Sequence, residues 1–445
     1  MTRISLFLAA AMAAVFFSTS SLAATDEETQ DRWVIIHAGQ LLAVPGEAPV
    51  SERSIVVHNQ HIDSVRRGFL QREEIDSNGA PVLVIDLSDR FVLPGLIDAH
   101  DHITAKPGRI KQVWPTTTTD AMKAIYGAHY AKITLEAGFT TVRNIGSSGL
   151  AIYALRDGIA KGLVPGPRLL AAGHYISTTG GHGDKSTGFR PDLYGSLDHD
   201  GLCDGIESCR RAARLQIKKG ADWIKIMATG GVNSEAATGV GLHFDPETLQ
   251  AIVDAAHALG RKVAAHAHAA EGINAALRAG VDSIEHGAFL DEESIRLFKE
   301  TDTYLVATLN VGAHVLEIAN DPESGMSQAV RGKARDAIPQ MDENVAKAYE
   351  AGVKIAFGTD SGEPAHGTNA DEFLHLVRIG MSEMDAIETA TVNAADLLDM
   401  SDDVGTIEEG KYADMVATSG DPLEDIAALT EVGFVMKSGK VYKSD

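Results

Sequence analysis

The chain is poor in cysteine, with only Cys203 and Cys209 among 445 residues. Their spacing matches no zinc-ribbon or redox motif, which argues against a thiol role in catalysis. If Asp204 and Gly205 form a turn before a helix that starts near Ile206, the two sulfurs can form a disulfide. If both cysteines lie on that helix, they are nearly two turns apart and cannot be joined. The sequence leaves both arrangements open.

Positive charge is also scarce, since 39 Lys and Arg stand against 62 Asp and Glu, for a net charge of −23. An acidic surface repels nucleic acids and anionic membranes, so the balance argues against both partners and favours a small-molecule substrate. Hydrophobic residues make up 44% and charged residues 23%, which is typical of a soluble globular enzyme and excludes disordered, collagen-like and coiled-coil classes.

Long apolar runs are missing beyond the N-terminus. Residues 1–24 contain one Arg, an apolar run from Ile4 to Phe17 and small residues up to Ala23 and Ala24, which predicts a secretory signal peptide. The run is shorter than the ~20 residues that a membrane span needs. We therefore expect a secreted protein, periplasmic in a Gram-negative source, with no membrane partner after cleavage.

The chain also lacks the glycine-rich nucleotide turn that a doubly wound sheet would place after its first strand. Short apolar runs instead alternate with amphipathic helices, such as the one that Asp245 caps with Pro246 at its first position. The predicted strands are FVLPGLIDAH, TTVRNIG, LLAAG, ADWIKIMATGG, KVAAHAH, SIEHG, TYLVATL and KIAFGTD. Eight strand-helix units predict an α/β fold, a (β/α)8 TIM barrel over residues 91–401.

Both flanks of this barrel have a different pattern. Residues 25–90 contain short alternating runs such as WVIIHAG and SIVVHNQHIDSV between Gly, Pro and Asn turns, and GFVMKSGKVYK near the C-terminus is similar. We expect residues 25–90 and 402–445 to form one small β-sandwich domain from both chain ends.

Six candidate metal ligands lie in order at or near the ends of predicted strands: His100, His102, Lys225, His266, His286 and Asp360. Parallel barrel strands bring their C-terminal ends to one rim, so this order predicts a shared site. His100 and His102 are two residues apart and point the same way in an extended segment, so both can bind one ion.

The other ligands each have an alternative role. His266 or His286 alone could be a hydrogen-bonded core histidine, and His268 could replace His266 as a ligand. Lys225 lies in an apolar strand, where it either pairs with a barrel carboxylate or has reacted with CO₂ to give a carbamate that bridges two cations. Asp360 can bind a metal and accept a proton from its water.

These motifs resemble the amidohydrolase superfamily over nearly all of the mature sequence. PGLIDAHDH is similar to its first-strand His-x-His, IKIMATGG to its carboxylated-lysine strand, AHAH and IEHG to its imidazole strands, and GTD to its terminal aspartate. The resemblance implies two divalent metals, with zinc expected, N6-carboxylysine at Lys225 and a homo-oligomer. Asn144 departs from the pattern, because many relatives have Asp there, and puts a charge-based role of that position in doubt.

STTGGHGD and EPAHGTNADEF are similar to the Xaa-Pro dipeptidase and carboxypeptidase-like branch, some members of which cleave ochratoxin. This implies hydrolysis of an amide bond to a C-terminal amino acid, in dipeptides such as Xaa-Pro or in N-acyl amino acids. The metals would lower the pKa of a bridging water from about 15.7 towards ~7, and Asp360 would move its proton. Tyr175, His182 and His268 are the candidate substrate-binding residues. The alternatives are an imidazolonepropionase-like hydrolase of a cyclic amide and a non-catalytic binding protein on the same scaffold.

Overall fold

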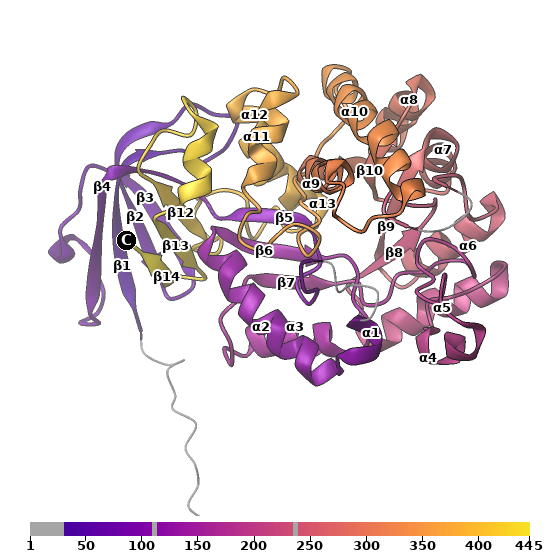
Figure 1. The fold of residues 1–445 in the computed structure, drawn as a ribbon. Helices are drawn as coiled ribbons and strands as arrows, with labels where there is room; N and C mark the ends of the chain where they lie inside the picture. Colours follow the sequence, from indigo (N-terminus) through magenta and orange to yellow (C-terminus); the bar gives the residue numbers. More distant parts are fainter. Residues whose placement is uncertain (1–30, 109–113, 235–238) are drawn as a thin grey trace, which may run out of the picture.

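A computed structural model describes residues 31–108, 114–234 and 239–445. The predicted signal peptide, residues 1–24, lies outside the described residues. The ribbon has two parts that lie side by side (Figure 1). One is a β-sheet built from both ends of the chain, and the other is a barrel of parallel strands surrounded by helices. Among the described residues, no helix combines the length and the apolar character that a bilayer span requires.

Parallel strands form the barrel in two hydrogen-bonded groups. The first contains β5 (Leu96–Asp101), β6 (Phe139–Asn144) and β7 (Arg168–Ala171), and the second contains β8 (Trp223–Met227), β9 (Lys262–Ala269), β10 (Ser283–Phe289) and β11 (Tyr304–Val306). Parallel bridges between Ile176 and Ile226, Leu305 and Ile355, and Asp101 and Ser361 connect the groups. Residues 355–361 therefore take the eighth strand position and close the ring, which confirms the predicted barrel.

Helices follow the strands and cover the outside of the barrel (Figure 1). Their bounds are α1 (Trp114–Thr117), α2 (Asp120–Glu136), α3 (Ala151–Ala160), α4 (Tyr194–Leu197), α5 (Ile206–Lys219), α6 (Pro246–His257), α7 (Ala270–Arg278), α8 (Glu292–Thr301), α9 (Leu309–Asn320), α10 (Gln328–Glu350), α11 (Asp371–Arg378), α12 (Glu383–Thr389) and α13 (Val392–Leu397). The predicted cap of α6 is present, because the Asp245 carboxylate accepts a hydrogen bond from the Thr248 backbone N–H at 2.8 Å.

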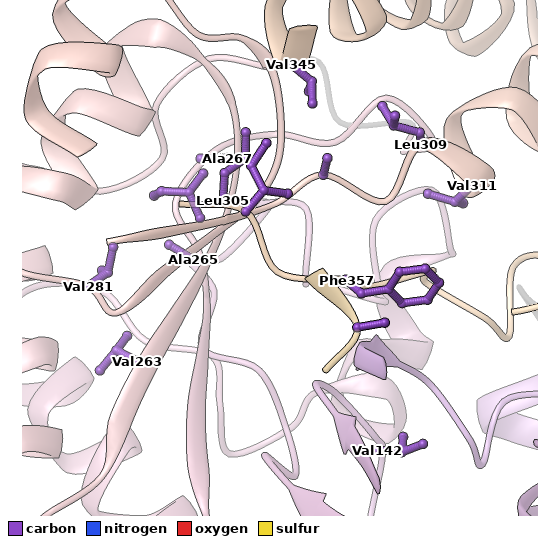
Figure 2. Packing of buried hydrophobic residues seen from close by; sticks show 14 of the residues in the cluster. Val142, Val263, Ala265, Ala267, Val281, Leu305, Leu309, Val311, Val345 and Phe357 are labelled. Carbon is purple, nitrogen blue, oxygen red and sulfur yellow. The ribbon is translucent and has the colours of Figure 1, made fainter. Parts of the chain in front are cut away.

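Small and β-branched side chains fill the space between the strands and the helices, and Figure 2 shows Val142, Val263 and Leu305 in this core. Phe357 brings the eighth strand position into it. Its ring centroid lies 5.5 Å from that of Phe139 and 4.4 Å from that of Phe373 on α11. These aromatic contacts hold the eighth strand position against both β6 and α11, three residues before Asp360.

The β-domain is one seven-stranded sheet. Its strands, in spatial order, are β14 (Lys440–Ser444), β13 (Phe434–Lys437), β12 (Met415–Thr418), β4 (Val82–Pro94), β1 (Trp33–Leu41), β2 (Val50–His58) and β3 (His61–Arg67). Strands from the two chain ends pair directly where β12 lies antiparallel to β4. The sheet confirms that both ends of the chain form one domain.

The predicted start of the barrel at residue 91 is wrong by a few residues. Phe91 and Pro94 lie in β4 and pair with Thr418 and Met415 of the sheet, and the first barrel strand begins only at Leu96. Gly95 separates the two strands. A Cβ atom at Gly95 would lie 2.2 Å from the Thr140 Oγ1, so this close approach requires glycine. The sequence predicted one strand over FVLPGLIDAH because the residues on both sides of Gly95 are apolar.

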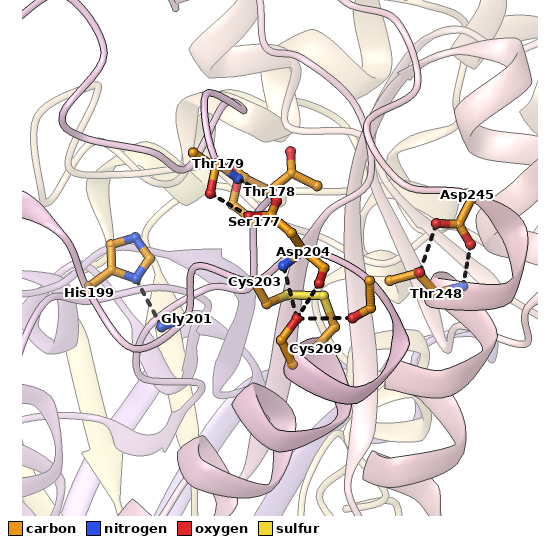
Figure 3. Close-up of a disulfide and its surroundings, with 12 residues drawn as sticks. Ser177, Thr178, Thr179, His199, Gly201, Cys203, Asp204, Cys209, Asp245 and Thr248 are labelled. Carbon is orange, nitrogen blue, oxygen red and sulfur yellow. Dashed lines mark hydrogen bonds between the residues drawn. A yellow bond between two sulfur atoms is a disulfide. The ribbon is translucent and has the colours of Figure 1, made fainter.

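Cys203 and Cys209 form a disulfide, with Cα atoms 5.0 Å apart. The helix begins at Ile206, so Cys203 lies before it and Cys209 on it, as the turn arrangement requires (Figure 3). The Cys203 backbone N–H also donates to the Ser177 carbonyl at 3.0 Å. The disulfide thus joins the end of the long loop after β7 to α5, and the hydrogen bond joins the same end to the start of that loop.

Replacing both cysteines with serine should destabilise the protein by about 2 kcal/mol, because the unfolded chain regains the entropy of a short closed loop. Dithiothreitol should lower the thermal midpoint of the wild type but not that of the double variant. Differential scanning fluorimetry with and without reductant measures both. Equal sensitivity of the two proteins to reductant would contradict the assignment.

Candidate metal centre

All six predicted ligands lie on barrel strands or directly after them. His100 is in β5 with His102 directly after it, Lys225 is in β8, His266 in β9 and His286 in β10, and Asp360 lies near the end of the eighth strand position, residues 355–361. Together with the predicted substrate residues they line one cavity of about 470 Å³. The barrel therefore brings together residues that are up to 260 positions apart in the sequence.

The Asp360 carboxylate lies between the first two histidines. Its Oδ1 is 3.1 Å from the Nε2 of His102 and 3.6 Å from the Nε2 of His100. Ligand atoms of His100, His286 and Asp360 lie within 4.8 Å of one another, a spacing that one ion can bridge. Histidine nitrogens and a carboxylate oxygen suit zinc and several other divalent metals.

Hydrogen bonds on the far side of two rings fix which nitrogen faces the centre. His100 donates from Nδ1 to a Glu285 carboxylate oxygen at 2.6 Å, and His102 donates from Nδ1 to the Gly146 carbonyl at 2.7 Å. Each ring therefore keeps its Nε2 lone pair for a metal. A Cβ atom at Gly146 would lie 3.1 Å from both the His102 and the Tyr175 rings, so Tyr175 is a neighbour of this ligand.

The remaining imidazoles are oriented in the same way. The Thr308 hydroxyl donates to the Ala307 carbonyl at 2.6 Å, so His286 Nδ1, 2.7 Å from that hydroxyl, donates to it and keeps Nε2 for the centre. His266 Nε2 lies 3.3 Å from the Gly230 carbonyl, which leaves its Nδ1 as the ligand atom. In both cases a backbone-anchored partner selects the tautomer.

Burial keeps these rings neutral. It lowers the pKa of His100, His266 and His286 well below the usual value, with the neighbouring cationic groups as a further cause. A neutral imidazole is the form that binds a metal, so the site needs no proton release from these rings at neutral pH.

Lys225 is the least expected of the six predicted ligands, and its surroundings distinguish between its two predicted roles. Its side chain is 1% exposed, and its Nζ has no hydrogen-bond partner within the described residues. Burial lowers the pKa of Lys225 to about 8. The predicted alternative of a salt bridge to a barrel carboxylate is therefore absent in the part of the chain that the structure describes.

Two ligands occupy a strained backbone conformation. His286 has φ 75° and Asp360 has φ 57°, in the left-handed region that costs a non-glycine residue energy. His286 lies within β10, whose pairing with β9 shifts register after it, and Asp360 lies within the eighth strand position, so the strand geometry is interrupted at both ligands. Such strain persists where the surrounding structure holds it, and it is common at functional sites.

A charged pair below the ligands was not predicted from the sequence. Arg143 on β6 donates to Glu285 at 3.0 Å, and both side chains are fully buried. Arg143 also lies 4.4 Å from the centroid of the Trp223 ring. Glu285 directly precedes the ligand His286 in IEHG, and its other carboxylate oxygen lies 2.6 Å from the Nδ1 of His100. The sequence did contain a signal for this pair, because Arg143 and Glu285 are charged residues in two apolar strands that were predicted to be buried.

Asn144, which departs from the family pattern, has a structural role. Its side-chain oxygen accepts from the Ile103 backbone N–H at 2.8 Å and its amide donates to the Ser147 hydroxyl at 3.0 Å. It therefore joins the loops after β5 and β6 without needing a charge.

The predicted substrate residues border the ligands. The His182 ring stacks on His266 with centroids 4.4 Å apart, and the His268 ring stacks on His286 at 5.2 Å. Burial lowers the pKa of His268 to about 4, so this ring is neutral. The opposite wall of the cavity is apolar and comes from α9 and α10 through Val311, Val315, Ile338 and Met341.

The closed parallel barrel with its polar residues at the C-terminal rim defines the chain as a barrel enzyme. The amidohydrolase family model matches residues 91–442, and the chain belongs to the amidohydrolase family. It is a hydrolase that acts on amide bonds.

Several relatives are similar over almost the whole chain. Ochratoxinase of Aspergillus niger is 33% identical, covering 95% of this chain and 88% of its own. The structure of a Xaa-Pro dipeptidase with bound methionine in its active site has a TM-score of 0.86 and 42% identity, covering 93% of this chain and 100% of the other. A prolidase complexed with N-methylphosphonate-L-proline has a TM-score of 0.82 and 30% identity, covering 93% and 100%.

Glu285→Gln should weaken metal binding by about 10- to 100-fold, because His100 loses the carboxylate that orients it and Arg143 loses its buried partner. Competition with a chromophoric chelator measures the metal affinity. Glu293→Gln is the matched control, since its partners Arg278 and Arg296 are exposed, and it should leave the affinity unchanged. Wild-type affinity in Glu285→Gln would refute the positioning role.

Proposed function

We propose that the protein is a binuclear metal-dependent hydrolase that cleaves the amide bond to a C-terminal amino acid. The observation that carries this proposal is the buried Nζ of Lys225, which lies beside imidazoles and a carboxylate and has no hydrogen-bond partner in the described part of the chain. Burying an amine without a hydrogen bond raises the free energy of the folded protein unless another group binds to it. Addition of CO₂ to the neutral amine, with loss of a proton, gives an anion that two cations can share.

The donor set fits two divalent ions, and zinc suits it. His100, His102, His266, His286 and Asp360 offer nitrogen and oxygen ligands with ring nitrogens already oriented, and carboxylated Lys225 would bridge. When bound, the ions supply Lewis acidity and lower the pKa of a coordinated water.

The residues of the chain would do the remaining work. Asp360 accepts the proton of the attacking water at its carboxylate and delivers it to the amide nitrogen that leaves. His182, Tyr175 and His268 orient the substrate from the cavity wall beside the ligands. The apolar side chains of α9 and α10 exclude water from the opposite wall and receive a nonpolar group of the substrate.

The substrate class follows from the relatives together with the cavity. A volume of about 470 Å³ accommodates a dipeptide or an N-acyl amino acid. The named relatives act on a Xaa-Pro dipeptide or on ochratoxin, as their names state. We further propose that the protein is secreted through its N-terminal signal and assembles as a homo-oligomer.

Lys225→Ala should lose most of its bound metal, and bicarbonate should not restore it. In protein equilibrated with ¹³C-bicarbonate, the wild type should give a carbamate carbonyl signal in the NMR spectrum that the variant lacks. Metal content is read by plasma emission spectroscopy.

Lys437→Met is the matched control, because burial lowers the pKa of Lys437 to about 8 as well, while its Nζ is 2.6 Å from the Gly166 carbonyl. It should keep both the signal and the metal. Fewer than about one metal per wild-type chain after mild purification would refute the binuclear centre.

A hydrolysis screen with zinc-loaded protein should include Xaa-Pro dipeptides, dipeptides with other C-terminal residues, N-acyl aryl amino acids and a small cyclic amide. We expect turnover of substrates with a C-terminal amino acid, detected as a released amine. Asp360→Asn should lower kcat by at least 100-fold on the same substrates, because the proton acceptor is lost. Turnover of the cyclic amide alone would favour the imidazolonepropionase-like alternative instead.

A further inference from the structure

Lys185, which was not among the residues predicted from the sequence, lines the same cavity. It belongs to GGHGDKS, in the loop between β7 and α5, and its side chain is exposed. Its Nζ lies 5.4 Å from the centroid of the Tyr175 ring. Tyr175 in turn borders the ligand His102 across Gly146. The ammonium therefore stands beside the metal centre, one aromatic ring away from a ligand.

Among residues 31–108, 114–234 and 239–445, Lys185 forms no ion pair within 4.0 Å; its ammonium hydrogen bonds to Tyr175, and the charges of Glu363 and Asp360 act on it from farther away. The pKa of Lys185 is raised, chiefly by the charge interaction with Tyr175, so the side chain is a cation at neutral pH. Another lysine of the cavity wall is compensated, because Lys123 lies 3.3 Å from Asp120 and donates to Ser148 at 2.7 Å. An ammonium at the wall of a substrate cavity that has a phenol but no carboxylate in direct contact is suited to bind an anion.

The backbone around Lys185 is firmly held, so its position is set before a substrate arrives. Asp184 is buried and accepts hydrogen bonds from the Gly180 N–H at 2.8 Å and the Ser186 N–H at 2.9 Å. The Gly183 N–H donates to the Ser177 hydroxyl at 3.0 Å. The Cys203–Cys209 disulfide fixes the far end of the same loop, next to Ser177 (Figure 3). Preorganisation lowers the entropic cost of binding a charged group.

We propose that Lys185 binds the α-carboxylate of the amino acid that leaves, and so selects substrates with a free C-terminus. This inference rests on the proposed function. In such a substrate the carboxylate carbon is two bonds from the amide nitrogen, so a cation close to the ligands is where the carboxylate must lie. In a protein with net charge −23, a local cation also offsets the repulsion of an anionic substrate.

The test compares kcat/KM for an N-acyl amino acid with that for its primary amide, which has nearly the same shape without the charge. The wild type should prefer the free acid by about 10- to 100-fold, as expected for a charge-assisted hydrogen bond. In Lys185→Met the free acid should lose that factor while the amide changes less than about threefold. Lys185→Arg should retain part of the preference, since it keeps the charge.

Lys106→Met is the matched control for the general potential of the cavity, because Lys106 also lines it and its Nζ lies 5.8 Å from the Tyr126 ring centroid. This variant should keep the wild-type preference. Equal losses on both substrates in Lys185→Met, or an unchanged preference, would overturn the proposal, and metal content and thermal midpoint establish that the variant is folded.

A failure of the proposed function gives a different result. The wild type would then hydrolyse neither substrate. Calorimetric titration of the wild type with a free amino acid and with its amide tests Lys185 without turnover. Equal affinities for the two would overturn the Lys185 assignment as well, whereas tighter binding of the acid, lost in Lys185→Met, would support it.

Discussion

A single buried carboxylate connects the interior of the barrel to its rim. Glu285 on β10 is bonded by Arg143 on β6 and by His100 on β5, and Ser283 donates to it at 2.5 Å from two residues earlier in its own strand. These contacts cross the barrel between strands that are not neighbours in the sheet. A carboxylate buried without such donors would cost several kcal/mol, so the orientation of His100 and the charge balance of the interior depend on each other.

The ligands lie in a water-excluding interior of apolar side chains and paired polar ones such as Arg143 and Glu285, and this burial explains their protonation states. Burial holds the imidazoles neutral and leaves the amine of Lys225 without a hydrogen-bond partner among the residues that the structure describes. The lining of the cavity therefore has three parts that differ in polarity. Ligand nitrogens and oxygens form its floor, the loop after β7 gives a polar wall, and α9 and α10 give an apolar one.

Much of this arrangement could be predicted from the sequence, because parallel strands place their ends at one rim. His100, Lys225 and Asp360 were found in this way, since each interrupts or ends an apolar run. Glu285 and Arg143 were missed, because their partners are 140 or more residues away and no local pattern reports such a pairing. Lys185 lies in a loop whose path depends on a disulfide that the sequence left undecided.

The boundary between sheet and barrel was missed for a related reason. Phe91 and Leu96 belong to one apolar run, and only the choice of pairing strands separates them. Local propensity carries no information about which sheet a strand joins.

The single glycine between β4 and β5 has a consequence for how the molecule can be divided. β4 lies in the middle of the seven-stranded sheet, and four residues after it ends the chain has reached Asp98 on the first barrel strand. At this junction a single residue joins the two parts, whereas residues 398–414 connect α13 to β12 at the other junction. A truncation that removes the N-terminal strands of the sheet must therefore end directly against the strand that carries His100, and it leaves that strand without the chain that precedes it.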